Sequence, residues 1–125
     1  MYIRWPNPIS MGISESYMRI ISKALADVLE RLGSLAEFVR CIEVIFVKVN
    51  GAIVPDFTVH IGTEVHPASF ATQVPFAGSL PTYADVIRHF GTNGLLRGRI
   101  LQHLSPPDYD SVVKGIRTAF QPRIK

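Results

Sequence analysis

Cysteine and charge are both scarce in this sequence. Cys41 is the single cysteine, so no disulfide can form within the chain, which favours a reducing compartment. Charged residues make up 18% of the chain, against about 25% in average soluble proteins. A surface this poor in charge predicts that some apolar area is covered by a partner or by a second copy of the chain.

Long apolar runs and cofactor motifs are missing as well. No stretch of about 18 apolar residues could span a membrane, and the first residues lack the apolar core of a signal peptide. We therefore expect a cytoplasmic protein with no membrane association. There is no GxGxxG, P-loop or GxSxG motif, so nothing predicts a cofactor, or nucleotide binding through those devices.

Apolar residues are abundant enough for one core. The chain has 125 residues, of which 47% are hydrophobic, and a net charge of only +3. A chain of this size buries about two-thirds of its unfolded surface, and this composition argues against disorder. We predict a single domain over residues 1–125.

Asn50-Gly51 is the strongest local signal, because it stands between two runs rich in β-branched residues. A type I′ turn needs positive φ at both central positions, so this dipeptide predicts a hairpin over 41–62. A two-residue loop pairs Val49 with Ala52 and Phe46 with Pro55. One face is then apolar and consists of Ile42, Val44, Phe46, Ile53, Pro55, Phe57 and Val59. The other face is mixed and carries Glu43, Ile45, Val47, Asp56, Thr58 and His60.

Pro55 predicts where the hairpin stops pairing. In this register its missing N–H points away from the first strand, so proline blocks a further ladder only on the outer side. The second strand should therefore be an edge near Pro55. Two strands alone are marginal in water, and residues 2–5 and 70–76 are candidates for further strands.

Helical periodicity flanks the hairpin on both sides. Apolar residues at three- and four-residue steps predict a helix over 14–32, capped by Ser14 or Ser16 and stopped by Gly33. After a loop over 62–81, further helices are predicted at 82–90, 94–104 and 105–121. The order indicates an α+β fold, with an N-terminal amphipathic helix packed on a small antiparallel sheet centred on the 41–62 hairpin, followed by about three C-terminal helices.

Histidines and carboxylates near the hairpin are the candidate catalytic groups. His60 is diagonal to Glu43 on the mixed face, and a histidine beside a carboxylate can act as a general base. His66 and Asp56 are the other candidates. The alternative is that Glu43, Asp56 and His60 form an ordinary polar sheet face and that His66 is a surface histidine. No histidine spacing matches a metal pair on a strand or a helix, so no metal site is predicted. Cys41 is expected to be a small buried hydrophobe with no base signalled nearby.

Arginine dominates the basic residues, and five arginines lie in the C-terminal part of the chain: Arg88, Arg97, Arg99, Arg117 and Arg123. Such a basic region can bind phosphate, nucleic acid or an acidic protein. No aromatic residues interleave with these arginines in a stacking pattern. A solvated polar face is therefore the competing interpretation.

The absence of cofactor motifs and ligand clusters favours a binding protein over an enzyme. We expect a small protein-binding module, in its narrowest form an inhibitor or immunity-type protein that masks a partner. The expected binding residues are His60, Thr58, Glu64, His66, Arg88, Arg97 and Arg99. Two alternatives stay open, namely a small hydrolase that uses His60 or His66 and a nucleic-acid binder that uses the C-terminal arginines. Homodimerisation is a separate hypothesis.

Overall fold

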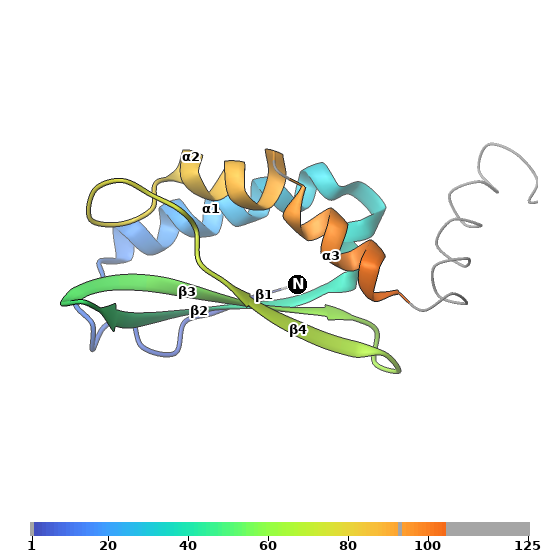
Figure 1. Cartoon of the computed structure of the whole chain (residues 1–125), viewed down its shortest axis with the longest axis horizontal. Helices are drawn as coiled ribbons and strands as arrows, with labels where there is room; N and C mark the ends of the chain where they lie inside the picture. The colour runs from blue at the N-terminus through green and yellow to red at the C-terminus, as the bar shows by residue number, and fades with distance from the viewer. Residues whose placement is uncertain (1, 93, 105–125) are drawn as a thin grey trace, which may run out of the picture.

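The computed structural model describes residues 2–92 and 94–104. Four strands form one sheet in the order β1-β2-β3-β4, and the helices lie together on one side of it (Figure 1). The elements are β1 Tyr2–Arg4, α1 Glu15–Leu32, a 3-10 segment Gly33–Phe38, β2 Val39–Val49, β3 Ala52–Gly62, β4 Pro67–Thr72, α2 Tyr83–Val86, its π-helical continuation Ile87–Thr92, and α3 Leu95–His103. The mixed α and β content agrees with the predicted class. The helix predicted over 105–121 lies outside the described residues.

The predicted hairpin forms in the predicted register. Asn50 and Gly51 have φ values of 51° and 82°, as a type I′ turn requires. Val49 pairs with Ala52, and Phe46 pairs with Pro55. The first strand begins at Val39, two residues earlier than the predicted hairpin.

The strand β4 pairs with β3 only beyond Pro55, where backbone N–H groups are present. β4 pairs with β3 from Phe57 to Gly62, and among residues 2–92 and 94–104 no strand pairs with the outer side of Pro55. The edge predicted near Pro55 is therefore confirmed. Within the loop predicted over 62–81, alternating partly buried residues form β4 at Pro67–Thr72. The strand candidate 70–76 is therefore confirmed over 70–72, but the strand begins and ends earlier than predicted.

The strand β1 corrects the predicted topology in two ways. β1 precedes α1, so the helix is not the first element, and β1 pairs with β2 in parallel. The sheet is therefore mixed rather than antiparallel. The reason is the connection, because a helical crossover such as α1 returns the chain in its starting direction and so joins parallel strands.

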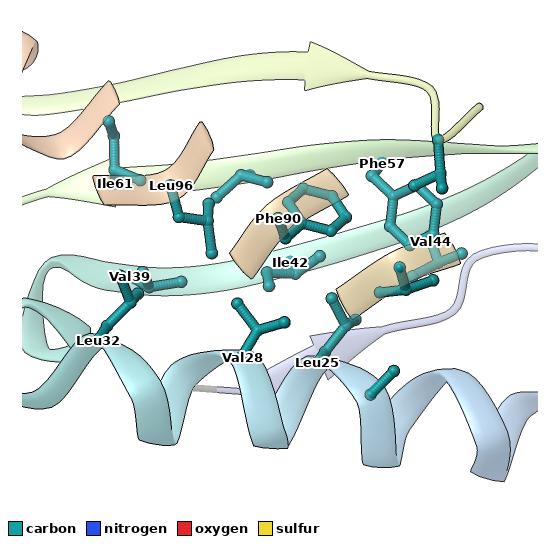
Figure 2. Packing of buried hydrophobic residues seen from close by; sticks show 14 of the residues in the cluster. Leu25, Val28, Leu32, Val39, Ile42, Val44, Phe57, Ile61, Phe90 and Leu96 are labelled. Atoms are coloured by element: carbon teal, nitrogen blue, oxygen red, sulfur yellow. The ribbon is translucent and has the colours of Figure 1, made fainter. Parts of the chain in front are cut away.

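The core lies between α1 and the apolar face of the hairpin. The Ser14 side chain accepts a hydrogen bond from the Tyr17 N–H, and Gly33 ends the helix with φ 62°. In Figure 2, Leu25, Val28 and Leu32 project from α1 toward the sheet. All three are buried together with Ile42 and Val44, so the predicted dry face is confirmed.

The helix predicted over 82–90 starts as expected but does not stop at Gly91. Thr82 and Asp85 form a capping box at its start. Beyond Val86 the helix widens into a π-helical segment that runs through Gly91 to Thr92. Phe90 in this segment is fully buried, and its ring lies 5.3 Å from that of Phe57 in an edge-on arrangement. The wider turn thus accompanies the packing of Phe90 into the core.

Candidate functional site

The helices pack on one face of the sheet, so none of the helices in the described part of the chain covers the opposite face, here called the outer face (Figure 1). Strand pairing aligns its side chains in rows. The first row is Tyr2, Cys41, His60 and Ser69, and the second is Arg4, Glu43, Thr58 and Ala71. Nearer the turn, Ile45 pairs with Asp56 and Val47 with Val54. The outer face therefore has a polar end and a more apolar end.

A β-bulge shapes the polar end. The register between β2 and β3 shifts between Val39 and Cys41, which leaves Arg40 as the extra residue. Strict alternation would turn Arg40 toward the core with Ile42. Instead Val39 is buried in the core cluster, and Arg40 is exposed beside Cys41. A bulge re-aims side chains in this way, and here it adds a guanidinium group to the outer face.

Glu43 is the electrostatic centre of the polar end. Its Oε1 lies 2.6 Å from His60 Nε2, and its Oε2 lies 3.7 Å from the guanidinium of Arg4. The hydrogen bond with His60 is the main reason that the pKa of Glu43 falls below its usual value, and the charge of Arg4 adds to the effect. Glu43 therefore stays ionised and holds both basic side chains in place.

An open hollow lies at this end of the outer face. It has a volume of about 300 Å³ and is lined by Tyr2, Arg4, Arg40, Cys41 and His60. Arg40 forms no ion pair within residues 2–92 and 94–104. Among the described residues, the lining includes two arginines and no carboxylate, and the neighbouring Glu43 supplies one negative charge. The described groups therefore make the hollow net positive.

Cys41 is buried, as expected, with 5% of its surface exposed. The expectation that no base lies near it was wrong, because His60 is its direct partner across the β2–β3 ladder. The register that pairs Val49 with Ala52 already implies this pairing, so the sequence carried the signal. Among the described residues, the thiol makes no hydrogen bond with the imidazole.

The structure brings together only part of the predicted site. Glu43, Asp56, Thr58 and His60 share the outer face, but Asp56 lies beyond the row of Glu43 and Thr58. Glu64 and His66 lie in the turn after β3, where the backbone carbonyl of His66 is 2.9 Å from His103 Nε2. His66 therefore does not join His60 in one site.

The predicted basic residues lie on the helical side of the molecule. Arg88 pairs with Asp85 at 3.3 Å, and the guanidinium carbon of Arg99 lies 4.8 Å from the centre of the Phe70 ring. Arg97 is exposed on α3. Two of these arginines thus have partners within the chain. Arg117 and Arg123 lie outside the described residues, and nucleic-acid binding stays a prediction.

Three further findings bear on the function. They concern metal ligands, membrane-spanning helices and similarity to known proteins. No group of three or more histidine, cysteine or acidic side chains is arranged to hold a metal ion within the described ranges. Among the helices that the structure describes, none combines the length and apolar character needed to cross a membrane. Comparison of the chain with protein-family models, curated proteins and solved structures found no match.

Proposed function

We propose that this chain is a protein-binding module whose partner docks on the outer face of the sheet. The observation that carries the proposal is the position of Ile45, Val47 and Val54. An antiparallel sheet with one solvated face normally places polar residues on that face. Here three aliphatic side chains stand on it instead, and they are absent from the residues that pack with the core.

The surroundings of these side chains suit an interface. Asp56 and Thr58 border the aliphatic residues, and Arg4, Glu43 and His60 lie farther along the same face. Stable interfaces combine an apolar centre with a polar rim. In the narrower form of the proposal, the chain is an inhibitor or immunity-type protein that masks its partner when it binds.

Site-specific crosslinking in the native host tests the docking surface. A photoreactive residue at Val47 is expected to capture one protein in a near-stoichiometric yield. The same residue at Arg19, which is exposed on α1, is the matched control and should not capture it. A crosslink between two copies would assign the outer face to self-association. Equal capture at both positions, or none at Val47, would reject the proposal.

A small hydrolase is the second candidate, and one observation favours it. Cys41 faces His60, which is in turn bound to Glu43 at 2.6 Å, in the order of a nucleophile, a base and an orienting carboxylate. In such a mechanism His60 accepts the thiol proton, the thiolate attacks an acyl carbon, and the proton passes to the leaving group. Water would then cleave the thioester.

Paired substitutions distinguish this candidate from a binding role. Cys41→Ser and His60→Gln should each abolish hydrolysis of an activated ester while the chain stays folded. His66→Gln is the control, because His66 lies in the turn after β3 and not beside Cys41 and His60. Full activity in Cys41→Ser would exclude the thiol mechanism.

A further inference from the structure

We propose that the hollow at the bulged end of the outer face binds a small oxyanion, either a carboxylate or a phosphate. This inference goes beyond protein binding and does not depend on it. Its basis is the convergence of two guanidinium groups, an imidazole and a phenol on one concave surface: Arg4, Arg40, His60 and Tyr2.

Arg40 provides the charge that nothing in the described structure neutralises. The bulge turns its side chain away from the core and into the hollow beside Cys41. A strand without this bulge would have placed an arginine in the apolar core, which is costly. The bulge therefore places the Arg40 guanidinium, a cation, at the site.

Arg4 and His60 provide a second side to the hollow, and Glu43 positions both. The Arg4 side chain is 56% exposed and lies 3.7 Å from Glu43, so it has donors left for a ligand. His60 is 36% exposed and binds the same carboxylate through Nε2. One imidazole nitrogen is therefore fixed, and the ring is held at the rim of the hollow.

The chemistry of these groups selects the ligand class. Guanidinium groups match carboxylate and phosphate oxygens in a planar, two-point arrangement. Tyr2 can add a hydroxyl donor, and Cys41 forms part of the wall. A volume of about 300 Å³ is at the lower end of small-molecule sites, which suits a small anion or one anionic group of a larger molecule.

Titration of the full ¹⁵N-labelled chain tests the inference directly. Inorganic phosphate and acetate are added separately at constant ionic strength, with chloride as the reference salt. We expect saturable amide shifts in residues 2–4, 40–43 and 60, with a dissociation constant in the millimolar range, as befits a small ligand. Saturation by phosphate alone would assign a phosphate site, and saturation by acetate alone would assign a carboxylate site.

Two charge-removing variants make the test specific. Arg40→Gln should weaken binding about tenfold or more, because charge-assisted hydrogen bonds are lost. Arg19→Gln removes an exposed charge on α1, on the helical side, and should leave the affinity unchanged. Amide resonances that stay unshifted away from each substituted residue would verify that both variants fold. Linear, non-saturating shifts for both anions, or equal binding by Arg40→Gln, would overturn the inference. Either result leaves crosslinking at Val47 unaffected, so the two proposals fail independently.

Discussion

The side-chain amide of Asn7 bonds to both backbone groups of Phe46. Asn7 Nδ2 donates to the Phe46 carbonyl at 2.9 Å, and the Phe46 N–H donates to Asn7 Oδ1 at 2.9 Å. The two residues are 39 positions apart, which is the offset that relates paired residues of β1 and β2. Asn7 therefore continues the parallel ladder with its side chain after β1 has ended, and it occupies an otherwise open stretch of the β2 edge.

Removal of this amide should destabilise the fold. Asn7→Ala leaves the N–H and the carbonyl of Phe46 without their partner, and we expect the free energy of unfolding to fall by about 1–3 kcal/mol. Urea denaturation measures the change. Ser10→Ala is the matched control, because it deletes an exposed hydrogen bond of 3.2 Å to the Asn7 carbonyl. Equal losses in the two variants would contradict the role of Asn7 as a ladder residue.

Gly62 should not tolerate a side chain. Its φ is 96°, and a Cβ atom there would lie 2.1 Å from the backbone oxygen of His66. Gly62→Ala combines backbone strain with this clash, so we expect a loss of about 2 kcal/mol or more.

Gly78→Ala separates the two effects in Gly62→Ala. Gly78 has φ 91°, and no atom lies within 4 Å of the place that a Cβ would occupy, so alanine there adds strain without a clash. Thermal denaturation of both variants should show the larger loss for Gly62→Ala. Equal losses would mean that the turn at His66 moves aside at little cost.

Glu43 should contribute to stability in a pH-dependent way. Its pKa is lowered from 4.5, first by the hydrogen bond with His60. A carboxyl group whose pKa is lower in the folded chain stabilises the fold fully at pH values above its ordinary pKa. This stabilisation is lost as the pH falls through the pKa that the group has in the folded chain. The difference in stability between the wild type and Glu43→Gln should therefore be largest near neutral pH and shrink below about pH 4.5.

The control for Glu43 is Glu37→Gln. Glu37 is exposed and belongs to no ion pair within the described part of the chain. Denaturant titrations from neutral to acidic pH compare the two variants. A stability difference for Glu43→Gln that is the same at every pH would contradict the linkage.

His89 should make the fold less stable in mild acid. Burial lowers its pKa from 6.5, so as the pH falls below that value the unfolded chain takes up a proton that the folded chain resists. Stability should decline through this window, and His89→Gln should flatten the decline. Thr72→Val deletes the 2.7 Å contact with His89 Nε2 but leaves the ring in its half-buried place, so the decline should persist. A decline that disappears in Thr72→Val would assign the effect to that contact instead.

Part of the site could be predicted from the hairpin register alone. The turn at Asn50 and Gly51 implies that Glu43 is opposite Thr58, and the same register implies that Cys41 is opposite His60. Arg4 and Arg40 could not be found in this way. Arg4 joins the site only through the parallel pairing of β1, and Arg40 joins only through a bulge that breaks the alternation of β2.

By itself, the sequence determined the elements whose causes are local. Turn chemistry defined the hairpin, the spacing of apolar residues defined α1, and the missing N–H of Pro55 limited the pairing of β3, because each effect acts within a few residues along the chain. Only the tertiary structure decided which strands run parallel, that Pro67–Thr72 pairs with β3, and where Arg40 points. Those outcomes depend on contacts between residues far apart in the sequence, and hydrophobic periodicity carries no information about such contacts.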